Sequence, residues 1–195
     1  MRLPEAVTAA SNLLDDFVVP PKVARARATI EPQCGRWWCW AAVLQAILAR
    51  RGKKLRQCQI VDQHFEVTGT LGRDPDCCPR QGECKGTADD PCDQPADLGL
   101  VLANLGIAAA SPAYCKSIGI KKLVNQLKVH PVPCSFAGGM DPHYCLIDSS
   151  TKTASGYRIV LLDPSLGTRT TFSINSPCFV HPEGNRASEQ LYFLK

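Results

Sequence analysis

The chain has 195 residues, of which 45% are hydrophobic, and its 22 basic and 18 acidic residues give a net charge of +4. This length and composition are enough for one globular domain with a buried core. The small positive excess does not favour nucleic acid as a partner, because its densest run, from Arg50 to Arg56, has no interleaved aromatic residues. No stretch of the sequence approaches the roughly 18 consecutive apolar residues of a membrane helix.

The first 29 residues are expected to form an N-terminal arm ahead of one domain at residues 30–195. Apolar residues between Val7 and Val18 are spaced for a short amphipathic helix, which the following Pro-Pro pair ends. Acidic residues stand where a Sec-type export signal would have its apolar stretch. We therefore expect a protein without a Sec signal peptide that is cytoplasmic as made. The arm is expected either to pack on the domain or to stay mobile, in the manner of a pro-segment.

Helical patterns dominate the first half of the domain. Good helix formers from Trp40 to Arg50 predict a buried helix that Gly52 ends. A loop rich in Gly, Pro and Cys is expected over residues 68–93, and Asp93 is the expected N-cap of the next helix. Two further helices are expected at residues 55–67 and 118–128, and the helix after Asp93 is expected to end at Asn104.

Short β-type runs bounded by Gly, Pro, Asp or Ser follow His130. They are expected at residues 132–136, 143–148, 157–162, 168–174 and 190–194. Helices first and strands second is the pattern of an α+β fold, with a helical half packed on an antiparallel β-sheet half.

The segment Gln33–Ala41 (sequence QCGRWWCWA) combines the groups that a cysteine nucleophile needs. A cysteine that opens a buried helix has its sulfur beside unpaired backbone N–H groups and the positive end of the helix dipole, and both stabilise a thiolate. A neighbouring histidine can complete an ion pair and protonate the leaving group. The amide of Gln33, six residues before Cys39, can share the developing oxyanion with the backbone N–H of Cys39. The alternatives are a buried structural cysteine for Cys39 and a surface loop amide for Gln33.

This segment resembles the papain-like cysteine peptidases, which have a Gln six residues ahead of a catalytic Cys that Trp and Ala follow at the start of the central helix. Gln33, Cys39, Trp40 and Ala41 match that pattern position by position. The Trp-Cys-Trp-Ala-Ala sequence and the downstream cysteines are more similar to a compact bacterial branch, of the staphopain and plant-pathogen effector protease type. The resemblance covers residues 30 to about 175 and implies a papain-like catalytic domain with the cysteine proteinase fold.

The resemblance has two departures. Arg36 stands where papain and the cathepsins have the first cysteine of their Cys-Gly-Ser-Cys-Trp signature, so the disulfide of that cysteine is not expected here. The spacing from Cys39 to His143 is also shorter than the ~130–150 residues that separate the catalytic pair in papain itself. Substrate preference is therefore not carried over.

Four histidines compete for the role of base. His64 lies in a predicted helix, His130 at a helix-to-strand connection, and His181 in the C-terminal tail. His143 opens an apolar strand, and the fold resembled here has its catalytic histidine at the start of such a strand. We therefore predict His143 as the base, with His130 as the alternative.

The third member of the triad orients the imidazole and is predicted to be Asp163. This residue ends the strand after that of His143, where the family resembled here has its Asn or Asp. An Asp-Pro pair also often begins a turn, which is the alternative interpretation. Asp141 and Asp148 are weaker candidates because they are so close to His143 in the sequence.

Eleven cysteines are many for a cytosolic protein, and their odd number leaves at least one thiol outside any disulfide. The cluster Cys77, Cys78, Cys84 and Cys92 lacks the paired spacing of structural zinc ligands, so disulfides are favoured over zinc or reduced thiols. Cys58 is the expected partner of Cys77 or Cys78. Disulfides imply an oxidising destination, which a protein without a Sec signal would reach through a specialised secretion system or as part of a longer precursor.

These observations predict a cysteine peptidase that cleaves peptide or amide bonds through a Cys39-His143-Asp163 triad and a thioester acyl-enzyme, with Gln33 in the oxyanion hole. Neither a cofactor nor a metal is expected. The expected partner is a protein or peptide substrate, and the bacterial resemblance implies an effector or toxin with a cognate inhibitor or immunity protein. The alternatives are a deamidase or transglutaminase-type acyl transferase that uses the same triad, and a catalytically inactive, cysteine-stapled binding module.

Overall fold

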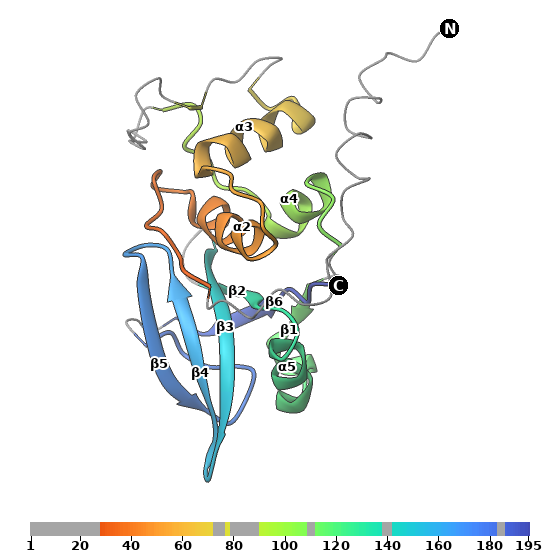
Figure 1. Ribbon diagram of the computed structural model, residues 1–195, viewed down its shortest axis with the longest axis vertical. Coiled ribbons are helices and arrows are strands. Elements are labelled where there is room, and N and C mark those ends of the chain that lie inside the picture. Colours follow the sequence, from red (N-terminus) through yellow and green to blue (C-terminus); the bar gives the residue numbers. More distant parts are fainter. Residues whose placement is uncertain (1–27, 72–76, 79–89, 109–111, 138–141, 183–185) are drawn as a thin grey trace, which may run out of the picture.

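The computed structural model describes residues 28–71, 77–78, 90–108, 112–137, 142–182 and 186–195. Within these residues the chain has an α+β fold in which helices come first and strands second (Figure 1), as predicted. The helices are α2 (Cys39–Arg50), α3 (Gln57–Thr68), α4 (Leu98–Asn104), the short 3₁₀-helix η1 (Cys115–Ser117) and α5 (Ile120–Leu127).

The strands form one six-stranded antiparallel sheet with the order β1-β6-β2-β3-β4-β5. They are β1 (Ala113–Tyr114), β2 (Val132–Phe136), β3 (His143–Thr153), β4 (Gly156–Asp163), β5 (Thr168–Ile174) and β6 (Ser188–Leu191). The strands predicted at 132–136 and 168–174 are confirmed at both ends, whereas the strand predicted at 190–194 begins and ends earlier, as β6. The sequence does not reveal β1, because two residues are too few to show an alternating pattern.

Alternate residues of β3 contribute to two apolar cores. Tyr144 and Leu146 pack with α2, α3 and α4, whereas Cys145 and Ile147 pack with α5 and with residues of the other strands. Successive side chains of a strand point to opposite faces, so β3 lies between the two layers of apolar side chains. Figure 1 accordingly shows α2, α3 and α4 gathered at one end of the molecule and α5 beside the strands.

The buried helix predicted from Trp40 begins one residue earlier, so that Cys39 is the first residue of α2. Its sequence is apolar on nearly every side, which suits a helix that is covered all round by α3, β3 and the chain between them. The N-cap residue is Trp38, and among the described residues no side chain caps this end of the helix. The first backbone N–H groups of α2 therefore remain available to a ligand.

The prediction that Asp93 is an N-cap is wrong. The helix that was expected to start there is α4, which starts at Leu98 with Asp97 as its N-cap, and the Asp97 side chain accepts a hydrogen bond from the N–H of Leu100 (2.8 Å). The carboxylate of Asp93 instead accepts two backbone N–H groups of the loop before α2. The Asp93 carboxylate, which the local pattern assigned to a helix cap, therefore accepts long-range hydrogen bonds instead.

The predicted arm, residues 1–29, lies outside the described residues except at its end. There, Ala28 is buried in the same core as α2, together with Ile30, which follows the arm. Most of the loop predicted at 68–93 also lies outside the described residues. Within the described part of the chain, the helices are all too short or too polar to cross a bilayer.

Asp148 is a buried carboxylate that joins the helical half to the sheet. Its Oδ1 lies 3.0 Å from the guanidinium of Arg50 at the end of α2, and its Oδ2 lies 3.2 Å from that of Arg169 on β5. The backbone N–H of Ala28 donates to the same carboxylate (3.2 Å). Asp148 is therefore accounted for by this ion pair, while Asp141, the other weak candidate for the triad, lies outside the described residues.

We predict that Asp148→Ala lowers the free energy of unfolding by about 3 kcal/mol, the lower end of the cost of breaking a buried ion pair, because both arginines can turn toward water. Chemical denaturation measures this change. Glu66→Ala, at an exposed position of α3, is the control and is expected to stay within about 0.5 kcal/mol of wild type. Equal stabilities for the two variants would contradict the assigned role of Asp148.

Candidate active site

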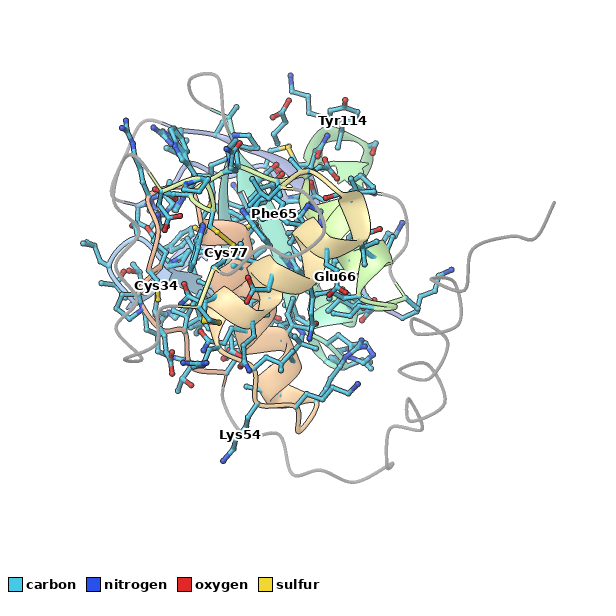
Figure 2. All side chains as sticks on the ribbon, turned by 90° about the horizontal axis from the view of Figure 1, so that it is seen from above. Cys34, Lys54, Phe65, Glu66, Cys77 and Tyr114 are labelled. Atoms are coloured by element: carbon cyan, nitrogen blue, oxygen red, sulfur yellow. A yellow bond between two sulfur atoms is a disulfide. The ribbon has the colours of Figure 1, made fainter. Side chains whose placement is uncertain are left out.

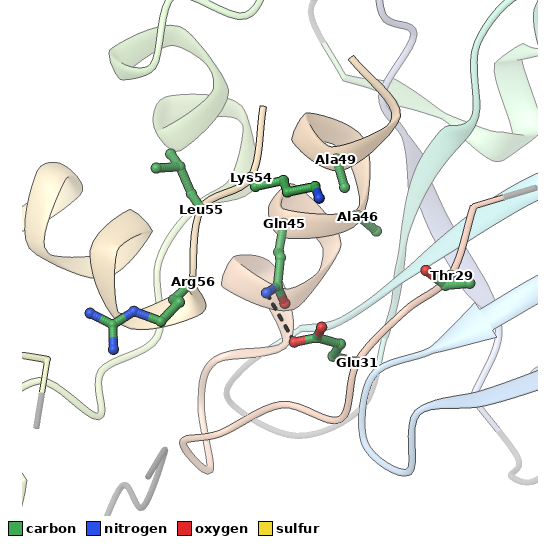
Figure 3. A pocket seen from close by; sticks show the side chains of 8 residues that line it. All are labelled: Thr29, Glu31, Gln45, Ala46, Ala49, Lys54, Leu55 and Arg56. Carbon is green, nitrogen blue, oxygen red and sulfur yellow. Dashed lines mark hydrogen bonds between the residues drawn. The ribbon is translucent and has the colours of Figure 1, made fainter. Parts of the chain in front are cut away.

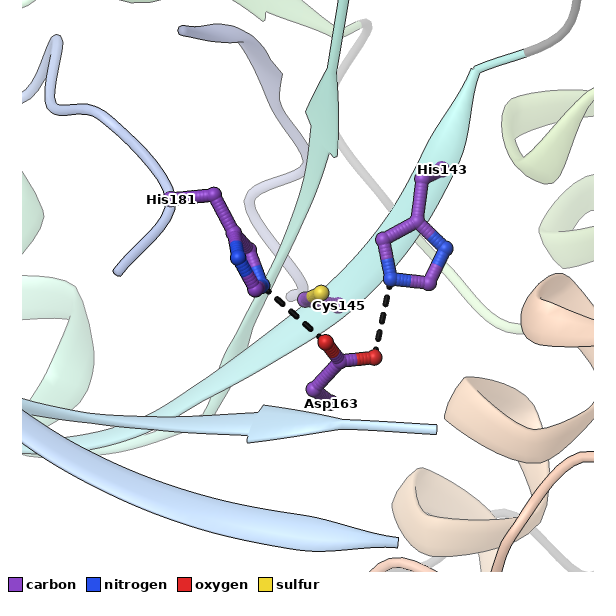
Figure 4. Close-up of side chains that lie close together, drawn as sticks. All are labelled: His143, Cys145, Asp163 and His181. Carbon is purple, nitrogen blue, oxygen red and sulfur yellow. Dashed lines mark hydrogen bonds and ion pairs between the residues drawn. The ribbon is translucent and has the colours of Figure 1, made fainter. Parts of the chain in front are cut away.

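The first residue of α2 and the first residue of β3 meet where the helical half contacts the sheet. The Cys39 thiol interacts with the imidazole of His143, whose pKa it helps to raise, and lies 4.0 Å from the carbonyl oxygen of Pro142. Nε2 of His143 lies 2.8 Å from Oδ1 of Asp163, the last residue of β4 (Figure 4). The structure therefore brings the three predicted triad residues together, with the imidazole between the thiol and the carboxylate.

Asp163 is a buried carboxylate whose Oδ1 accepts three hydrogen bonds. The donors are the ring of His143 and, from the following turn, the backbone N–H (2.8 Å) and the hydroxyl (2.7 Å) of Ser165. Burial works to raise the pKa of Asp163, but the hydrogen bonds from His143 and Ser165 and the charge on His143 outweigh it and hold the pKa well below its ordinary value. Asp163 thus begins a turn and also contacts His143, so its two interpretations are compatible. The hydrogen bonds from Ser165 in the turn act together with His143 to keep the carboxylate ionised.

His143 is held in its protonated form by its neighbours. Burial works to lower its pKa, but the hydrogen bonds to Asp163 and Cys39, together with their negative charges, outweigh burial and raise the pKa of His143 to about 9. An imidazolium at neutral pH is the form that can donate a proton to a leaving group.

Gln33 lies in the loop before α2, and its amide nitrogen is already engaged. Its Nε2 donates to the carbonyl oxygens of Gly35 (3.0 Å) and Arg36 (2.6 Å). These bonds occupy both amide hydrogens, so an oxyanion could receive one of them only if the amide exchanged partners. The role of Gln33 in the oxyanion hole stays a prediction.

Two close approaches join the loop before α2 to the turn after β4. The backbone N–H of Gln33 donates to the carbonyl of Pro164 (2.7 Å). Gly167 has a positive φ of 64°, and a Cβ at this position would come within 2.8 Å of the ring of Pro32. Both the positive φ and the lack of space for a Cβ require glycine at position 167. The close approach of the loop before α2 to this turn keeps Asp163 near the start of α2.

The other histidines differ in their surroundings. His64 is buried in α3 against Trp40, and burial lowers its pKa. His130, the alternative base, has a pKa lowered by burial and by the positive charges of Arg51 and Arg50. Within the described part of the chain, neither residue makes a hydrogen bond, ion pair or ring contact with Cys39 or Asp163, so the structure does not bring them to the site.

His181 joins the site, which the sequence did not indicate. Its Nε2 lies 3.1 Å from Oδ2 of Asp163, beside the ring of His143 (Figure 4). The ring of His181 packs edge-on against those of Phe136 and His143. His181 lies in an irregular segment before β6, so no predicted strand pairing relates its position to that of Asp163. The His-Pro sequence itself also does not indicate this contact.

The donor set of a transition-metal site is present around Asp163. Ligand atoms of His143, Cys145, Asp163 and His181 lie within 4.8 Å of one another. The 2.8 Å separation between His143 and Asp163 is that of a direct hydrogen bond. Cys145 is fully buried in the apolar core that β3 shares with α5. The hydrogen-bonded triad accounts for this arrangement of His143 and Asp163.

A separate hollow of about 360 Å³ lies where residues 29–31 run past α2 (Figure 3). Glu31 accepts a hydrogen bond from Nε2 of Gln45 inside it (3.0 Å), and Lys54 and Arg56 also line it. None of its lining residues belongs to the cluster around His143. This hollow is therefore not part of the candidate active site.

Disulfides form as predicted in the helical half. Cys58 pairs with Cys78 and Cys77 with Cys92, so Cys58 does bond one member of the adjacent pair and these sulfurs are not free to bind zinc. Figure 2 shows Cys34 and Cys77 on the same side of the molecule as α3, and Cys34 is also disulfide-bonded. Cys84 lies outside the described residues. A further disulfide, Cys115–Cys178, joins η1 to the segment before β6 and was not predicted.

Comparison with known proteins adds no identification: neither protein-family models nor curated proteins give a match to this sequence. The geometry of the site and the resemblance of the segment around Cys39 are therefore the two indications of function.

We predict that the imidazole of His143 titrates with a midpoint near pH 9. Below that pH the ring is protonated. Because folding raises this pKa from its ordinary 6.5, the resulting stabilisation is complete below about pH 6.5 and is lost as the pH rises through about 9. Side-chain NMR of the histidine rings measures the midpoint, and Asp163→Asn and Cys39→Ala should each lower it by removing one of its causes.

His64 and His130 are internal controls for this titration, since burial lowers the pKa of each below 6.5. A wild-type midpoint for His143 at or below 6.5, alongside the two controls, would contradict the described geometry.

Proposed function

We propose that this protein is a cysteine peptidase with a papain-like fold, in which Cys39 is the nucleophile, His143 the general acid and base, and Asp163 the group that orients the imidazole. The observation that carries the proposal is the position of His143, whose ring interacts with Cys39 and lies 2.8 Å from Asp163. A helical half that contacts an antiparallel sheet, with the nucleophile at a helix N-terminus, is compatible with that fold.

In the acylation step, the thiolate of Cys39 attacks the carbonyl carbon of the scissile bond, and a C–S bond forms as the carbonyl π electrons move onto oxygen. The N–H of Cys39 lies at the uncapped start of α2 and can donate to this oxyanion. When the oxyanion collapses, the C–N bond breaks and the imidazolium of His143 gives its proton to the leaving amine. The products are a free amine and a thioester on Cys39.

In the deacylation step, the neutral His143 takes a proton from a water molecule as the water oxygen attacks the thioester. The C–S bond then breaks, which releases a carboxylic acid and returns Cys39 to the thiolate and His143 to the imidazolium. Asp163 remains a carboxylate throughout, because its pKa is held far below neutrality by its hydrogen bonds. Its function is to fix the tautomer and the orientation of the ring.

The same triad serves hydrolysis of a backbone peptide bond, deamidation of a side-chain amide and transfer of the acyl group to an amine. We favour a peptide or protein substrate with hydrolysis, on the resemblance of Gln33, Cys39, Trp40 and Ala41 to the peptidases. An effector or toxin role with a cognate inhibitor is proposed from the same resemblance.

The test is intact-mass analysis after incubation with an epoxide-type cysteine-peptidase inhibitor, followed by mass spectrometry of products from a peptide library. We expect one adduct, on Cys39. The other described cysteines outside disulfides are fully buried, and burial raises the pKa of the Cys134 thiol far above its usual range. Cys39→Ala should abolish the adduct and lower the rate of product formation about 10³-fold or more.

His143→Ala is expected to reduce activity to a similar extent, whereas His130→Ala is the matched control and is expected to keep wild-type activity. Full activity of the Cys39→Ala variant would contradict the proposed function. New peptide termini indicate hydrolysis, and conversion of a side-chain amide to an acid or a crosslink indicates the related acyl transfers. A chain that neither reacts with the inhibitor nor forms any product would instead be the binding module.

A further inference from the structure

Residues 92–94 lie against the turn that delivers Cys39 to the site. The carboxylate of Asp93 accepts two consecutive backbone N–H groups of this turn, that of Arg36 at Oδ2 (3.0 Å) and that of Trp37 at Oδ1 (2.8 Å). Both bonds are charge-assisted and span more than 50 residues of sequence. Asp93 thus holds the backbone two and three residues before the nucleophile.

The neighbours of Asp93 hold the same turn from the side. The indole of Trp38 donates to the carbonyl of Cys92 (2.8 Å), and the indole of Trp40 donates to the carbonyl of Gln94 (3.2 Å). Both indoles are buried, at 2% and 0% exposure, so an unmade bond would leave a buried donor without a partner. Two of the three tryptophans around Cys39 therefore serve this attachment.

The fit between the two segments is close. A Cβ at Gly35 would lie 2.6 Å from Oδ1 of Asp93 and 2.8 Å from the ring of Trp38. Glycine is the one residue that lets the carboxylate approach the backbone at this point. The position of Asp93 and the shape of the turn are therefore coupled.

A disulfide fixes the segment that carries Asp93. Cys92, the preceding residue, is bonded to Cys77, and the backbone N–H of Cys77 donates to Asp62 on α3 (2.6 Å). Cys78 is bonded to Cys58, also on α3. Residues 92–94 are thus anchored to α3 through the adjacent cysteines.

We propose that Asp93 is a positioning residue for the Cys39 nucleophile and that the Cys77–Cys92 disulfide keeps it in place, so that the assembly of the site depends on this disulfide. The inference deepens the proposed function, on which its kinetic part rests. Asp93 has no contact with the reacting atoms in the described structure and acts through the backbone of the turn. Release of that turn would move both the thiol and the oxyanion donor at the start of α2, and a displacement of about 1 Å can cost 10²-fold in rate.

The first test compares Asp93→Ala with Asp97→Ala. Both variants remove an aspartate that accepts a backbone N–H, but Asp97 caps α4 and has no bond to the turn. For Asp93→Ala we expect about a 10²-fold lower kcat with little change in KM, and a titration midpoint of His143 below that of wild type, because the interaction with Cys39 is one of the causes that raise it. For Asp97→Ala we expect the wild-type midpoint and kcat.

Asp93→Asn retains one carbonyl acceptor and is expected to give an intermediate loss, which keeps the test informative if Asp93→Ala does not fold. Equal effects of the Asp93 and Asp97 variants on the midpoint and on kcat would overturn the inference. The NMR midpoint does not require a substrate. A chain without peptidase activity therefore refutes the proposed function while the positioning role is still decided by the midpoint.

The second test compares the double variants Cys77→Ala/Cys92→Ala and Cys115→Ala/Cys178→Ala. The second disulfide closes a sequence separation of 63 residues and the first one of 15, so loop entropy predicts that removing the second costs more stability. If the site depends on the first disulfide as proposed, its loss lowers kcat and the His143 midpoint further than loss of the second does, although the second fixes the segment of His181 and its loss is the more destabilising change. Loss of both quantities in the Cys115/Cys178 variant to the same extent would overturn the dependence on Cys77–Cys92.

Discussion

The imidazole of His143 is held between a thiol and a carboxylate that belong to different halves of the molecule. Cys39 comes from the first turn of α2, and Asp163 comes from the end of β4. Both neighbours contribute to the raised pKa of His143, whereas burial alone would lower it. The position of α2 against β3 therefore matters most for the site, because a small shift of the helix would separate the thiol from the ring.

The helix α2 is fixed at both of its ends. At its C-terminal end, Arg50 pairs with the buried Asp148 of β3, which also binds Arg169. At its N-terminal end, the preceding loop is bonded on one side to Asp93 and on the other to the carbonyl of Pro164, next to Asp163. In the middle of the helix, apolar residues fill the core between α3 and β3, and Gln45 bonds to Glu31 and Gln57 at its surface. Polar contacts thus set the position of a helix that apolar packing stabilises.

Local patterns were sufficient for most of the fold. Helix formers predicted α2, and short β-type runs bounded by turn residues predicted β2 and β5 at both ends. The start of α4 was misplaced because Asp93 and Asp97 are equally good caps by sequence, and only the contact of Asp93 with the loop before α2 separates them. The segment before β6 has no periodic pattern, and its contribution to the site was therefore missed.

Residue types and their spacings in the sequence were enough for the α+β order of elements and for a candidate nucleophile at the start of a buried helix, because such patterns act over one turn of helix or one strand. His143 and Asp163 became candidates because their places at the start and end of successive strands match those of the family that the segment around Cys39 resembles. Only the tertiary structure decided that Asp163 also contacts His181, that Gln33 is engaged by its own loop, and that Asp93 holds the turn before Cys39. The contacts of Asp163 and Asp93 join segments that local patterns leave independent, and such groups can meet only when the chain packs its core.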